Sequence, residues 1–92
     1  MVTAFVLINV EDRQVREIGE KLLDLAGVAE VHVVAGEYDM VAVVRVEDNR
    51  HLSDLITDHV LGIDGIRRTK TLFALQSFMC PGASVSNPCV SE

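Results

Sequence analysis

The order in which two kinds of apolar pattern follow one another most constrains what this chain can fold into. Continuous β-branched and aliphatic runs predict strands, whereas apolar residues at three- and four-residue spacing predict amphipathic helices. Runs of the first kind occupy residues 2–10, 28–35, 40–46 and 67–78. Helical patterns lie between Asp12 and Gly27 and over 48–61. The predicted order is therefore β-α-β-β-α-β.

Short connections then limit how these elements can be arranged. Asp12 is a plausible N-cap of the first helix, and Gly27 is a plausible stop after it. Residues 36–39 are too few for a crossover, so the strands on either side form an antiparallel hairpin. Two right-handed split β-α-β units give an α+β, ferredoxin-like fold, with both helices on one face of a four-stranded antiparallel sheet.

The predicted strands are apolar on both faces, although two helices can cover only one. One face carries Ala4, Val6, Ile8, Met40, Ala42, Val44, Phe73 and Leu75, and the other carries Phe5, Leu7, Val41, Val43, Leu72 and Ala74. Leaving the second face in water would expose a patch on the order of 500 Å², near the upper limit for a soluble monomer. The sequence therefore predicts at least a dimer, in the form of a dimeric α+β barrel.

Composition excludes several classes of function. The 92 residues suffice for one domain, and their net charge of -6 leaves Arg67, Arg68 and Lys70 as the densest basic cluster. Direct nucleic-acid binding needs a basic stripe, so it is not expected. The N-terminus has no basic region before an apolar stretch, and no run is long enough to span a membrane, so we expect a cytoplasmic protein.

The end of the chain differs in composition from the rest. Residues 80–92 are rich in Pro, Gly, Ser and Asn, and we expect a flexible tail there after a domain over 1–79. Cys80 and Cys89 lie in this tail. In a reducing cytosol we expect both to be free thiols.

No residue pattern signals catalysis, a metal or a cofactor. His32, His51 and His59 are scattered, and His51 and His59 are about two helical turns apart, too far for one ion. No serine stands in a nucleophile signature, and no glycine-rich phosphate loop is present. We therefore predict a protein that is not an enzyme. The alternative is a small dimeric α+β barrel enzyme, monooxygenase- or isomerase-like, using His32 and residues 36–39.

Two short segments could bind a ligand. Gly36, Glu37, Tyr38 and Asp39 share one tight connection, where Asp39 either caps backbone N–H groups or receives a ligand ammonium while backbone N–H groups receive its carboxylate. Thr69 and Thr71 alternate along the last strand, so they share a face with Phe73 and Leu75. Their hydroxyls could bond a polar ligand, or they reflect the ordinary β propensity of Thr.

Residues 33–39 and 65–71 carry a family resemblance. They read Val-Val-Ala-Gly-Glu-Tyr-Asp and Gly-Ile-Arg-Arg-Thr-Lys-Thr, and with the surrounding 2–78 they resemble the effector-binding (RAM) domain of the Lrp/AsnC transcriptional regulators. The resemblance implies sheets packed face to face in dimers, rings of dimers that are often octamers, and an amino acid bound between subunits. It implies effector-site roles for Gly36, Glu37, Tyr38, Asp39, Thr69 and Thr71.

Regulators of this family also carry a helix-turn-helix domain, for which 92 residues leave no room. The resemblance therefore implies a stand-alone effector domain that binds an amino acid or similar metabolite and acts on full-length regulators. A pure oligomerisation element without a ligand remains a third hypothesis.

Overall fold

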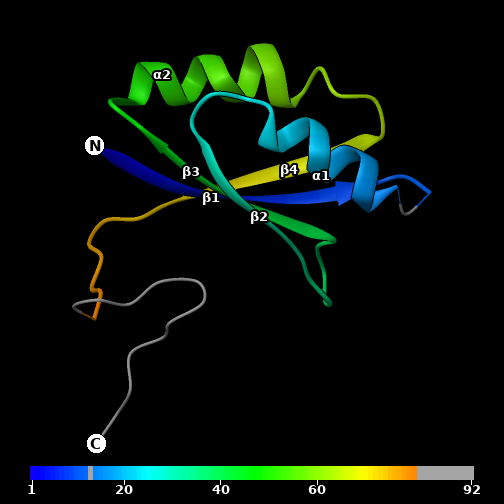
Figure 1. The fold of residues 1–92 in the computed structure, drawn as a ribbon, viewed down its shortest axis with the longest axis horizontal. Helices are drawn as coiled ribbons and strands as arrows, with labels where there is room; N and C mark the ends of the chain where they lie inside the picture. Colours follow the sequence, from blue (N-terminus) through cyan, green and yellow to red (C-terminus); the bar gives the residue numbers. More distant parts are fainter. Residues whose placement is uncertain (13, 81–92) are drawn as a thin grey trace, which may run out of the picture.

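The computed structural model describes residues 1–12 and 14–80. Its elements are β1 (Val2–Val10), α1 (Val15–Leu23), β2 (Val28–Val33), β3 (Met40–Val46), α2 (Asn49–Asp54), η1 (Leu55–Val60) and β4 (Ile66–Phe73). The strands form one sheet in the order β2-β3-β1-β4, and every neighbouring pair is antiparallel. The helices lie on one side of this sheet (Figure 1). The predicted α+β, ferredoxin-like order is confirmed.

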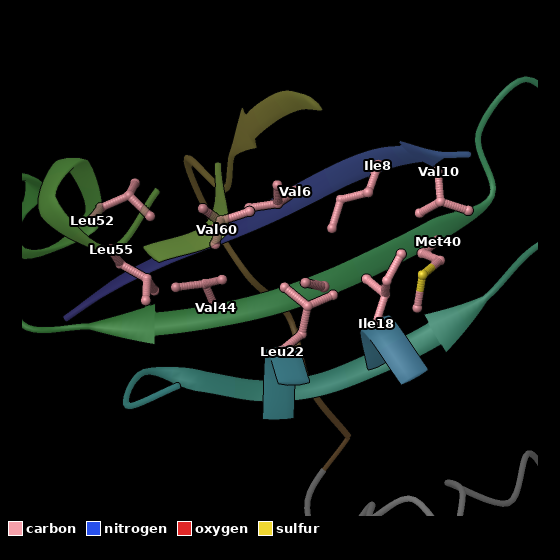
Figure 2. Packing of buried hydrophobic residues seen from close by; sticks show 12 residues of the cluster. Val6, Ile8, Val10, Ile18, Leu22, Met40, Val44, Leu52, Leu55 and Val60 are labelled. Atoms are coloured by element: carbon pink, nitrogen blue, oxygen red, sulfur yellow. The ribbon is translucent and has the colours of Figure 1, made fainter. Parts of the chain in front are cut away.

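The core lies between the helices and the two central strands. Val6 and Ile8 of β1 and Val44 of β3 are fully buried, and they face Ile18 and Leu22 of α1 (Figure 2). Leu52, Leu55 and Val60 close the core from the second helical region. Alternate residues of β1 are therefore buried under the helices, as the predicted period of two requires.

The first helix begins later than predicted. Gln14 occupies the N-cap position without a side-chain hydrogen bond, and Asp12 instead has a φ of +54°. The reason is that the sheet continues past β1: the Glu11 N–H donates to the Gly65 carbonyl at 2.7 Å. The chain must then turn sharply before the helix, so the prediction of Asp12 as N-cap was wrong.

Two glycines occupy equivalent places in the two halves of the fold. Gly27 and Gly65 both have a φ of +99°, just before β2 and β4. A Cβ on Gly27 would lie 2.8 Å from Val46 Cγ1, and one on Gly65 would lie 2.9 Å from Ile18 Cδ1. Each position thus requires glycine both for its backbone conformation and for close packing.

The second helix is divided into two kinds of turn. Asp48 caps α2, since its Oδ1 accepts from the His51 N–H at 2.9 Å. This hydrogen bond is the main reason why the pKa of the Asp48 carboxyl is lowered. From Leu55 the chain continues as the π-helix η1, and the Leu61 N–H donates to the Ile56 carbonyl five residues back.

Two strands end earlier than predicted. β2 ends at Val33, and the Val34 N–H donates to the Asp39 carbonyl across the turn that follows. β4 ends at Phe73 rather than at 78, because Ala74 makes the last backbone bond to Thr3 and β1 offers no partner before Val2. The following residues leave the sheet on the side away from the helices (Figure 1).

The predicted tail and its cysteines are only partly described. Cys80 is disulfide-bonded, so the expectation of a free thiol there was wrong. Cys89 and the rest of the predicted flexible tail, residues 81–92, lie outside the described residues.

Candidate effector-binding site

The loop between β2 and β3 is fastened to the end of β1. The Asp39 N–H donates to the Ile8 carbonyl at 2.9 Å, and Asp39 Oδ2 accepts from the Val10 N–H at 2.9 Å. A third bond runs from Asn9 Nδ2 to the Glu37 carbonyl, also at 2.9 Å. Three consecutive residues of β1 therefore hold the loop. One carboxylate oxygen of Asp39 caps a backbone N–H group, which is one of the two roles predicted for this residue.

A cleft of about 390 Å³ lies beside this loop. Its walls are Val15 of α1, Val33 of β2, and Val34, Ala35, Gly36 and Asp39. Gly36 has a φ of +140°, and a Cβ built on it would meet nothing within 4 Å. Its glycine is therefore required by backbone conformation, and the space around it stays open.

The loop also presents backbone donors. Within the described part of the chain, the N–H groups of Gly36, Glu37 and Tyr38 donate no hydrogen bond. Tyr38 is half-buried, whereas Gly36 and Glu37 are exposed. Successive unpaired N–H groups can receive an anion such as a carboxylate. The loop thus combines donors for a negative group with apolar walls.

The two threonines lie on the other side of β1 from this loop. Thr69 is paired with Ile8 and Thr71 with Val6, so both belong to the face that the helices cover, together with Phe73. Thr71 lines a separate cleft of about 240 Å³ with residues of α2 and η1, including Ser53 and Thr57. Within one chain the six candidate residues therefore form two groups separated by β1.

Asn9 is a residue that the sequence reasoning missed. Its Nδ2 reaches the loop, while its Oδ1 is buried and has no hydrogen-bond partner among the described residues. The signal was present in the sequence, because Asn9 is the one carboxamide in the apolar run 2–10. A carboxamide in such a run is a candidate for a role beyond packing.

The uncovered face of the sheet is apolar at its centre and charged at its edges. Phe5, Leu7, Val41, Val43 and Leu72 share this face by their register. The outer strands add charged residues: Glu30 and His32 come from β2, and Arg68 and Lys70 come from β4. Arg45 adds a charge at the end of the central strand β3. The prediction that both faces are apolar therefore holds for the central strands and fails for the outer ones.

The histidines belong to local pairs. His32 Nε2 lies 3.0 Å from Glu30 Oε1, and His51 Nδ1 lies 2.9 Å from Asp48 Oδ1. His51 and His59 line one cleft of about 410 Å³. Among residues 1–12 and 14–80, no group of three His, Cys, Asp or Glu side chains is placed to hold a metal ion.

Comparison with known proteins now decides the family. The profile of the Lrp/AsnC ligand binding domain matches residues 3–83. The chain belongs to the Lrp/AsnC ligand-binding domain family. The resemblance seen at residues 33–39 and 65–71 is thereby confirmed, and the fold described above is the fold of this domain.

Three similar proteins illustrate the family. The HTH-type transcriptional regulator FL11 of Pyrococcus furiosus is 32% identical over 75 residues, which are 82% of this chain and 49% of FL11. The crystal structure of TTHA0845 from Thermus thermophilus has a TM-score of 0.80 and 44% identity, and the match covers 85% of this chain and 98% of that one. The feast or famine regulatory protein Rv3291c of M. tuberculosis, complexed with L-methionine, has a TM-score of 0.74 and 28% identity. This match covers 92% of this chain and 57% of that one.

These relatives define the functional class. The chain spans about half the length of the curated relatives it matches, and those relatives are named transcriptional regulators. Membership therefore indicates a regulatory, ligand-binding family rather than a family of enzymes. In the described part of the chain, no helix is long and apolar enough to cross a membrane.

Proposed function

We propose that this chain is an effector-binding and oligomerisation module of the Lrp/AsnC type, which binds an amino acid between subunits and acts on full-length regulators. One observation carries the proposal: the loop Gly36–Asp39 offers backbone N–H groups that have no partner among the described residues, beside an apolar cleft, while three residues of β1 hold it in place. Such preorganisation lowers the cost of ordering the site on binding.

The chemistry of the cleft fits an α-amino acid. The N–H groups of Gly36, Glu37 and Tyr38 suit its carboxylate, and the oxygens of the loop suit its ammonium. Val15, Val33 and Val34 would pack against its side chain. The complex of the similar protein Rv3291c with L-methionine supports the same ligand class.

A second subunit would complete the site. Val33 is 63% exposed and Val34 is 37% exposed, so the apolar side of the cleft is open in a single chain. Burying about 500 Å² of apolar surface on each partner at the centre of the uncovered sheet face would release on the order of 25 kcal/mol before association costs. The proposed assembly is a dimer through this face, with rings of dimers, octamers among them, bringing loops of neighbouring subunits together.

The test measures assembly and binding together. Native mass spectrometry would be run on the chain alone and with each of the twenty standard amino acids, with calorimetry on every positive. We expect a dimer or a multiple of it, and a bound mass for one or a few amino acids. If none of the twenty amino acids binds at millimolar concentration, the chain is a pure oligomerisation element. A monomer at micromolar concentration would contradict the proposal.

A further inference from the structure

Asn9 lies next to an irregularity in the pairing of β1 with β4. It is opposite Arg68 of β4, and the register between β1 and β4 shifts between Asn9 and Val10. The Val10 N–H donates to Asp39 Oδ2, on the same side of β1 as the bond from the Asp39 N–H to the Ile8 carbonyl. The end of β1 thus stays paired with β4 and also holds the loop, and bulges of this kind commonly aim a side chain at a functional site.

The two ends of the Asn9 carboxamide have opposite surroundings. Its Nδ2 donates to the Glu37 carbonyl in a solvent-exposed hydrogen bond of 2.9 Å. Its Oδ1 is buried and accepts nothing from the described residues. Exchanging the positions of Nδ2 and Oδ1 would not satisfy the oxygen, because Oδ1 would then lie against the Glu37 carbonyl oxygen. The unpartnered acceptor is therefore a property of the site.

An unpartnered buried acceptor opposes folding, and buried polar groups in proteins are nearly always paired. The carboxamide that carries this acceptor also bonds the loop whose N–H groups suit a carboxylate. The acceptor therefore needs a hydrogen-bond donor, and a primary ammonium has three N–H donors. A neutral amide oxygen is a suitable acceptor for it.

Building on the proposed function, we propose that Asn9 is a ligand-contacting residue whose Oδ1 accepts a hydrogen bond from the ammonium of the bound amino acid. Access to Oδ1 requires the loop to shift. Gly36 is the residue where such a shift meets least resistance, since its backbone has a φ of +140° and no atom lies within 4 Å of a Cβ built there.

The experiment compares three variants of the full chain with the wild type. Asn9→Leu replaces the carboxamide by an apolar side chain of the same branching, which removes both the acceptor and the donor, and Asn9→Asp keeps an acceptor oxygen but removes the donor to Glu37. Thr3→Val is the matched control, because Thr3 lies on the same face of the same strand at its other end. Each would be titrated by calorimetry with L-methionine, with its deaminated analogue and with the other standard amino acids, and melted without ligand.

If Asn9 contacts the ammonium, Asn9→Leu binds the amino acid about tenfold more weakly or worse, because a hydrogen bond to a charged group is lost. Its melting temperature without ligand changes little, since the loss of a buried unpaired oxygen offsets the loss of the exposed hydrogen bond to Glu37. Asn9→Asp keeps the affinity, Thr3→Val changes nothing, and the deaminated analogue binds the wild type and Asn9→Leu equally.

Other outcomes overturn the inference. Equal affinity of Asn9→Leu and wild type would show that Oδ1 touches no ligand. Equal loss in Asn9→Leu and Asn9→Asp, with lower melting temperatures, would show that Asn9 only tethers the loop through Nδ2. Both results leave the proposed function standing. A wild-type chain that binds no amino acid of the panel would refute the proposed function, and the role of Asn9 with it.

Discussion

The carboxylate of Asp39 links the proposed site to the stability of the fold, and removing it is the most direct test of how the loop is held. Asp39 Oδ2 accepts from the Val10 N–H at 2.9 Å, and Val10 is only 9% exposed. In Asp39→Ala this N–H loses a charged acceptor and stays largely shielded from water. Hydrogen bonds to charged groups contribute about 1.5–3 kcal/mol, so we expect a loss of about 2 kcal/mol in the free energy of unfolding.

The corresponding change in melting temperature is large for a chain of this size. In domains of 60 to 100 residues, about 1 kcal/mol corresponds to roughly 4–8 °C. Asp39→Ala should therefore melt roughly 10 °C below the wild type, and urea unfolding should show an unchanged m-value. Asp58→Ala, which removes an exposed carboxylate of η1, is the control and should melt like the wild type.

Asp39→Asn separates charge from geometry. It retains an amide oxygen that can accept from Val10, so the stability loss should shrink to about 0.5–1.5 kcal/mol. The reasoning fails if Asp39→Ala melts with the wild type. That result would mean that Val10 finds water or another acceptor, and that the loop is held by the remaining bonds to Ile8 and Asn9 alone.

Three further predictions concern the surface, the helix cap and a glycine. Leu72→Glu places a charge on the uncovered sheet face and should shift the oligomer toward monomers in light scattering, whereas Leu23→Glu on α1, where Leu23 is 53% exposed, should not. Because the folded state lowers the pKa of Asp48, its contribution is present above the ordinary value of 3.8 and is lost as pH falls through the lowered pKa. Urea unfolding should therefore separate Asp48→Ala from the wild type at neutral pH and show convergence in strong acid. Gly27→Ala should cost about 1–3 kcal/mol in thermal unfolding, because it needs a strained φ and a Cβ 2.8 Å from Val46, whereas Gly62→Ala meets no contact under 3.5 Å. Equal melting of the two glycine variants would contradict this.

Local pattern was enough to predict most of the secondary structure. The bounds of β1 and β3 agree with the predicted 2–10 and 40–46, because a central strand is apolar along its whole length. The predicted bounds of the edge strands were less accurate. β4 looked longer in the sequence because Leu75 and Phe78 continue its apolar run, yet the strand ends where β1 runs out of residues to pair with.

The candidate site was likewise only partly predictable from the sequence. The loop Gly36–Asp39 could be found because glycine, acids and a phenol stand together in the sequence. The separation of Thr69 and Thr71 from it could not be found, since the position of β1 between β3 and β4 depends on strand order. The hydrogen bond that orients the Asn9 carboxamide likewise could not be found, since it comes from Glu37, 28 residues away.

The sequence by itself determined the order of elements, the helix-facing residues and the Gly-Glu-Tyr-Asp loop, since these depend on periodicity and turn chemistry among near neighbours. Only the tertiary structure decided which strand lies between the loop and the threonines, where β4 ends, and which polar atoms are left without partners. Those features depend on pairing between distant segments, where the register fixes the face of every side chain and the proximity of one loop decides what a single carboxamide can bond.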